Sequence, residues 1–156
     1  MGSPWANYVA AAIWLTAPPA AAQQLSELGL QTIATASDPG LVVGGGYGAL
    51  RTSERTRLSV GVGAGVSGNA AAWRAELLEH FQLHPHRRTG VGFYGAGGVA
   101  VVGGPVDQGY LVLTLGVEAR PGSPGGWFLE AGIGGGARLA AGYRWRRTPR
   151  PRWSGT

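Results

Sequence analysis

The stretch TRLSVGVGAGV, residues 56–66, decides the fold that the sequence predicts. Its even-numbered positions hold threonine, leucine, valine and alanine, whereas its odd-numbered positions hold arginine, serine and three glycines. Successive side chains of a strand point to opposite faces, so this segment has one apolar face and one face of small or charged residues. Strict alternation over this length predicts a β-strand with two unlike faces.

The same alternation recurs along the chain. It is clear in residues 110–120, 127–134 and 138–146, where leucine, valine and aromatic residues again share one face. Turn-forming clusters separate eight segments of this kind. The clusters are residues 38–40, 52–54, 67–69, 85–86, 103–105, 121–126 and 134–136. Short segments at such regular spacing predict an antiparallel β-sandwich or β-barrel.

The glycine-rich face decides between a sandwich and a barrel. In a soluble sandwich this face would meet water and carry many charges, but only 13% of the 156 residues are charged and 29 are glycine. In a membrane barrel the apolar face meets lipid, and a narrow lumen holds small residues and a few paired charges. The sequence therefore predicts an all-β protein, an eight-stranded antiparallel up-and-down β-barrel with Leu113 facing lipid and Gly116 facing the lumen. Leu113→Arg is then expected to block membrane assembly, and Gly116→Ser is expected to be mild.

The fourth segment, AAAWRAELLEHFQLH at residues 70–84, fits two structures. As a strand, its odd positions are mostly apolar and its even positions mostly polar. As a helix, Trp73, Leu77, Leu78 and Phe81 would form an apolar stripe, and alanine, leucine and glutamate favour helices. A small bacterial barrel needs an even number of strands, and seven other segments read as strands, so we favour the strand.

An N-terminal signal segment is predicted to precede the barrel. Residues 8–17, YVAAAIWLTA, form a short uncharged apolar run that two prolines end, and three alanines at 20–22 follow. This is the arrangement of a secretory signal with its cleavage site. The segment is either cleaved, retained as an anchor, or buried as a helix. We assign residues 1–22 to the signal peptide, 23–29 to a linker, 30–146 to the β-barrel and 147–156 to a basic C-terminal tail.

These features together resemble a family, the small eight-stranded outer-membrane β-barrel proteins of Gram-negative bacteria. The resemblance rests on the signal segment, on LSVGVGAGV at 58–66 and on the closing hairpin WFLEAGIGGGARLAAGYRW at 127–145. It implies a barrel in the outer membrane and carries no catalytic motif. The chain departs from the family in its loops, which are all short.

Charged residues on the glycine-rich face are expected to form a network inside the lumen. The members of this network are Arg74, Glu76, Glu118, Arg120, Glu130 and Arg138, with Arg57 and Arg144 in the wider set. Buried charges need partners because desolvation is costly. We expect Glu118 or Glu130 to contact Arg74, Arg120 or Arg138. The network either plugs the pore or lines a narrow, weakly anion-preferring path, and eight strands leave little room for the path.

The end of the chain combines aromatic residues with arginines. The residues concerned are Tyr143, Trp145, Arg146, Arg147 and Trp153. Aromatic residues interleaved with cations suit a membrane–water interface, so membrane lipid is the expected partner. The net charge of +5 comes largely from this tail, and nucleic acid is not an expected partner.

No motif for catalysis, a metal or a cofactor rises above chance. The chain has no cysteine, and the G-x-G-x-x-G pattern at Gly63, Gly65 and Gly68 is expected by chance in so glycine-rich a sequence. His80, His84 and His86 lack a metal-binding pattern and are interpreted as lumen or turn residues. The enzymatic alternative is a lipid-modifying barrel enzyme, which would need a serine and a histidine together near one rim, and the available serines are Ser59, Ser67 and Ser123.

Two functions follow from this reading. The first is a non-enzymatic outer-membrane barrel with a structural or interaction role. The alternative is a periplasm-side accessory subunit whose β-sheet domain docks on an inner-membrane complex, such as a respiratory or photosynthetic assembly.

Overall fold

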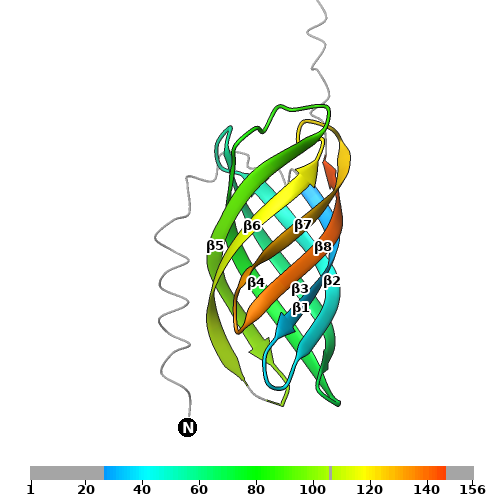
Figure 1. Cartoon of the computed structure of the whole chain (residues 1–156), viewed down its shortest axis with the longest axis vertical. Coiled ribbons are helices and arrows are strands. Elements are labelled where there is room, and N and C mark those ends of the chain that lie inside the picture. Colours follow the sequence, from blue (N-terminus) through cyan, green and yellow to red (C-terminus); the bar gives the residue numbers. More distant parts are fainter. Residues whose placement is uncertain (1–26, 106, 147–156) are drawn as a thin grey trace, which may run out of the picture.

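A computed structural model describes residues 27–105 and 107–146, and every regular element in this part of the chain is a β-strand. The strands are β1 (Glu27–Ala36), β2 (Leu41–Arg51), β3 (Thr56–Ser67), β4 (Ala70–Gln82), β5 (Val91–Gly103), β6 (Gln108–Ala119), β7 (Gly125–Ile133) and β8 (Ala137–Arg146). Each strand pairs antiparallel with the next, and β8 pairs with β1 to close the barrel (Figure 1). The predicted fold is confirmed. No helix in the described residues is long and apolar enough to cross a membrane.

The structure decides the type of the fourth segment and the start of the barrel. The ambiguous fourth segment is a strand, β4, which pairs with β3 along one edge and with β5 along the other. The barrel begins at Glu27, three residues before the predicted start at residue 30. Glu27 already pairs with Ala49 on β2 and Arg146 on β8, so these residues of the assigned linker belong to the barrel.

The barrel has an apolar outside and a polar inside. Leu111 and Leu115 on β6 are 79% and 75% exposed, whereas Arg74 on β4 and Arg144 on β8 are 1% and 0% exposed. Large apolar side chains project outward from every strand, and buried polar or charged side chains point inward from β1, β3, β4, β6, β7 and β8. The alternation therefore assigned both faces correctly, and Leu113 points outward with 61% of its surface exposed.

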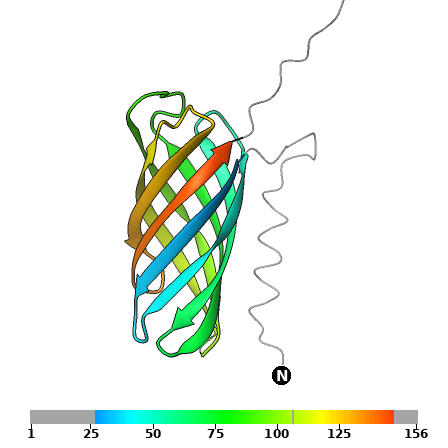
Figure 2. The same cartoon turned by 90° about the vertical axis from the view of Figure 1, so that its right-hand side faces the viewer.

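The two ends of the barrel differ in their connections. Glu27 and Arg146 pair with each other, so both ends of the described chain lie at one end of the barrel, which we call the terminal end (Figure 2). Loops 52–55, 83–90 and 120–124 also lie there. The other end, which we call the far end, carries the connections between β1 and β2, β3 and β4, β5 and β6, and β7 and β8, and the two longest loops, 83–90 and 120–124, lie at the terminal end.

Apolar side chains fill part of the interior. The first group comprises Ile33, Leu41, Val43, Ala72 and Ala140, with Val102 packed against it. The second comprises Leu78, Ala100 and Val112. Val43 and Val112 are almost completely buried. A lumen built by eight strands is narrow enough for such side chains to fill it, so the interior is a core rather than a channel.

Inward-facing glycines make room for large aromatic rings. Tyr94 lies over Gly116, and Phe128 lies over Gly142, so a Cβ atom at either glycine would overlap the ring. The Tyr94 ring is held in place because it is buried and its hydroxyl donates to Glu130 at 2.8 Å. This geometry corrects the expectation from the sequence that Gly116→Ser is mild. A substitution at Gly116 must displace a pinned ring.

Gly116→Ala should therefore lower the free energy of unfolding by about 1–3 kcal/mol, the usual cost of overpacking an interior. The measurement is urea unfolding followed by tryptophan fluorescence. Gly44→Ala is the matched control, because a Cβ at this outward-facing glycine would meet no atom within 4 Å. Equal unfolding midpoints for the two variants would contradict the proposed packing of Tyr94 over Gly116.

Candidate functional site

The charged lumen is the candidate site, and its first part lies near the terminal end. The Arg57 Nη1 atom lies 2.8 Å from Glu27 Oε2 and 3.3 Å from Glu118 Oε2. Arg144 Nε lies 2.9 Å from Glu118 Oε2, and Arg146 Nη2 lies 2.6 Å from Glu27 Oε1. We call these five residues the terminal cluster. Its two carboxylates are each held by two guanidinium groups.

A second group of charges, the central cluster, lies deeper in the lumen. Arg74 Nε is 2.6 Å from Glu76 Oε1, and Arg138 Nη2 is 2.9 Å from Glu76 Oε2. Arg138 also reaches Glu130, with 2.7 Å between Nη1 and Oε2. Two carboxylates and two guanidinium groups balance in charge. The expected contact between Glu130 and Arg138 is present, which confirms the pairing predicted from the sequence.

Several of these ion pairs cross the lumen. Glu76 is on β4 and Arg138 is on β8, and these two strands are not neighbours in the barrel. Arg57 on β3 reaches Glu118 on β6, and the Gln82 side chain on β4 donates to Glu118 as well. Because each bond spans the interior from one wall to another, the two clusters obstruct the pore.

Little open space remains around the clusters. Two interior cavities of about 10 Å³ each are lined by residues that include Gln31, Gly61 and Glu76. A volume of this size is at the lower limit for a single water molecule. A larger pocket of about 80 Å³ lies at the far end, lined by Thr35, Leu41 and other residues. Side chains of the two clusters therefore occupy the lumen around these two small cavities.

A serine and a histidine meet inside the lumen, as a nucleophile and its base would. Ser59 Oγ lies 2.8 Å from His80 Nε2. Arg57 Nη2 lies 3.5 Å from His80 Nδ1, and the Ser59 hydroxyl lies 3.3 Å from the Leu78 carbonyl oxygen, to which it donates.

Ser59 and His80 are both buried, and the two ring nitrogens of His80 lie against Ser59 and Arg57 inside the barrel. The structure therefore places His80 in the lumen, as the sequence predicted. His84 and His86 are exposed in loop 83–90, and the described residues hold no cluster of potential metal ligands.

The structure brings together five of the six predicted lumen residues. Arg74, Glu76, Glu118, Glu130 and Arg138 are all buried.

Arg120 is the exception, and its placement in the lumen was wrong. The alternation ends at Ala119, and Arg120 adopts a φ of 46° in the turn that follows β6. Its side chain is exposed, and only its carbonyl reaches the site, where it accepts from Arg144 Nη2 at 3.0 Å.

One member of the site was missed. Glu27 was assigned to the linker, although the alternation of Glu27, Leu28, Gly29 and Leu30 is the same signal that identified the other strands. Arg146 was expected at the membrane interface, yet its guanidinium group binds Glu27 and donates to the Pro121 carbonyl.

The aromatic residues at the end of the chain fall on both sides of the boundary of the described residues. Tyr143 and Trp145 point outward, with ring centroids 5.1 Å apart. Arg147 and Trp153 lie outside the described residues.

Comparison with solved structures supports the fold. The N-terminal β-barrel domain of Pseudomonas aeruginosa OprF superposes with a TM-score of 0.57 at 12% identity, covering 77% of this chain and 98% of that one. The de novo designed protein TMB2.3 superposes with a TM-score of 0.55 at 16% identity, covering 80% and 96%. No protein-family model and no curated protein matches the sequence. At these identities the likeness shows the eight-stranded barrel fold.

Proposed function

We propose that the protein is an outer-membrane β-barrel with a closed lumen that acts as a structural or interaction element and not as an enzyme. The observation that carries this proposal is the outer surface. Leucine, isoleucine and valine side chains on β1, β3, β6, β7 and β8 are more than half exposed. Such a surface is suited to lipid, whereas a soluble protein rarely exposes a contiguous apolar area of this extent.

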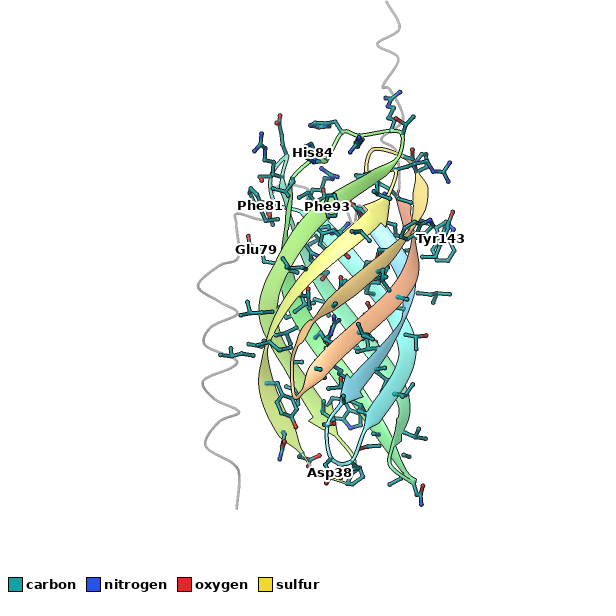
Figure 3. The ribbon with its side chains drawn as sticks, in the orientation of Figure 1. Asp38, Glu79, Phe81, His84, Phe93 and Tyr143 are labelled. Atoms are coloured by element: carbon teal, nitrogen blue, oxygen red, sulfur yellow. The ribbon has the colours of Figure 1, made fainter. Side chains whose placement is uncertain are left out.

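Aromatic residues support the placement in a bilayer. Five of them project outward from strand positions near the terminal end, and Figure 3 labels Phe81, Phe93 and Tyr143 of this set. The five are Phe81, Phe93, Trp127, Tyr143 and Trp145. Aromatic girdles of this kind mark the level where the apolar core of a membrane meets the headgroups.

The outward surface also favours this function over the alternative. A sheet domain docked on an inner-membrane complex would need an apolar face only where it touches its partner. Here every strand of a closed barrel carries an outward apolar face. The filled lumen in turn favours an anchoring or interaction role over transport of solutes.

Cell fractionation tests the proposal directly. The full-length protein, expressed in a Gram-negative host, should be recovered in the outer-membrane fraction. It should migrate differently on a gel with and without boiling, because a folded barrel resists detergent. Recovery in the soluble periplasmic fraction, or co-purification with an inner-membrane complex, would overturn the proposal.

Leu113→Arg should block assembly into lipid vesicles. Leu113 lies in the middle of β6 and points outward, and an arginine facing the middle of the bilayer costs about 2–4 kcal/mol. The measurement is the fraction of heat-modifiable protein after folding into vesicles. Leu113→Val, which keeps an apolar outward side chain, is the control and should fold normally. Normal assembly of Leu113→Arg would show that this face does not meet lipid.

Glu76→Gln should destabilise the folded barrel. The Glu76 carboxylate is shared by Arg74 and Arg138, and its loss leaves two buried guanidinium groups with fewer partners. Breaking a buried pair in this way costs about 3–5 kcal/mol. The measurement is the free energy of unfolding in urea, with the protein folded in vesicles.

Glu79→Gln is the matched control for Glu76→Gln. Glu79 lies on the same strand, points outward, and makes no ion pair within the described residues. Glu79→Gln makes the same chemical change without touching the lumen and should leave the unfolding free energy within about 0.5 kcal/mol of the parent.

A steady ion conductance of the parent protein in planar bilayers would contradict the closed lumen.

A further inference from the structure

Arginines outside the lumen gather at the terminal end. Arg55, Arg87, Arg88 and Arg120 are all exposed, and they come from the three loops 52–55, 83–90 and 120–124. We call these four residues the cationic rim. Among the described residues the far end exposes no arginine, and its loops carry Asp38 and Asp107 instead. The two ends of the barrel therefore differ in charge.

Hydrogen bonds between loops and strands hold the backbone of the rim in place. Arg120 N donates to the Gly90 carbonyl and Gly122 N donates to the Arg87 carbonyl, each at 2.8 Å. Gln82 N donates to the Arg55 carbonyl at 2.7 Å, which ties loop 52–55 to the end of β4. These hydrogen bonds fix the loops that carry the four arginines relative to one another and to the barrel wall.

The rim guanidinium groups have no carboxylate partner in the described part of the chain. Every ion pair found there belongs to the lumen. Arg87 Nη1 donates to the Val91 carbonyl at 3.0 Å, and Glu54 is the one acidic residue in the three terminal loops. The rim consequently presents a net positive charge that the described residues do not neutralise.

The rim lies just beyond the outward aromatic residues. Phe81 is the next-to-last residue of β4 and Phe93 the third of β5, so both lie immediately below loop 83–90, which holds Arg87 and Arg88. Figure 3 shows Phe81 and Phe93 near the terminal end and Asp38 at the far end. If the aromatic residues mark the edge of the apolar core, the rim is at the level of the lipid headgroups.

We propose that the cationic rim binds the phosphate groups of anionic phospholipids in the leaflet next to the terminal end. A guanidinium group donates two parallel hydrogen bonds to a phosphate, which is a stronger contact than a point charge alone makes. Basic residues at this depth attract anionic headgroups electrostatically. The proposal rests on the proposed function, because only a barrel in a bilayer brings its rim to the headgroups.

The test compares two lipids that differ in headgroup charge. The full chain is folded into phosphatidylcholine vesicles that contain a trace of nitroxide-labelled phosphatidylglycerol or labelled phosphatidylcholine. Electron paramagnetic resonance then gives the relative association constant of the two labelled lipids with the barrel. The parent protein should prefer phosphatidylglycerol by about fivefold at low salt, and salt should weaken this preference.

The variant R55Q/R88Q/R120N removes three rim charges. Asparagine is chosen at Arg120 because it tolerates the positive φ of that residue. The preference for phosphatidylglycerol should fall to less than about twofold. The control N69D/A70E/Q108E changes the net charge by the same amount at exposed positions of the far end and should retain more of the preference.

The outcomes separate this inference from the proposed function. If the parent chain does not fold into vesicles as a heat-modifiable barrel, the proposed function fails. If it folds but shows no preference for phosphatidylglycerol, or if the rim variant and the far-end control lose the preference equally, the barrel stands and the rim proposal is overturned. If the rim variant keeps the parent's preference for phosphatidylglycerol, the rim proposal is also overturned.

Discussion

The pairing of buried charges inside a narrow lumen is the constraint on which this structure depends. A barrel with an apolar exterior has only its interior for charged side chains, and eight strands leave no room for bulk water to solvate them. Every lumen carboxylate is therefore bound by at least one guanidinium group. Because the pairs connect strands that are not neighbours, the interactions that neutralise the charges also brace the wall and close the pore.

The narrowness of the lumen also explains why glycine occupies certain inward-facing positions. The lumen must hold Tyr94 and Phe128 as well as the charged clusters, and the wall has no space for additional Cβ atoms beneath these rings. The Tyr94 hydroxyl also donates a hydrogen bond to the buried Glu130 carboxylate. The packing of the Tyr94 ring over Gly116 and this hydrogen bond therefore depend on each other. Glycine at 116 and 142 is thus a consequence of fitting two aromatic rings into a narrow barrel.

The sequence predicted the strands and their faces because alternation is a local property. Thr56–Ser67 and Gln108–Ala119 each carry their inside and outside in the order of their residues. It predicted the contact between Glu130 and Arg138 as one of several possible pairings, but it did not predict the ion pairs that cross the lumen. Glu76 contacts Arg138, 62 positions away, and this contact depends on the relative shift of strands around the closed barrel. Arg120 was placed in the lumen wrongly because the alternation in the sequence continues through residue 120, whereas β6 ends at Ala119.

The asymmetry between the two ends follows from the way in which charge is distributed. Inside the barrel the arginines are held by carboxylates, so they contribute little field outside it. The arginines of the terminal loops lack such partners among the described residues, and the far end carries aspartates. The loops therefore give the two ends of the barrel unlike charge, in addition to the outward aromatic residues that lie near the terminal end.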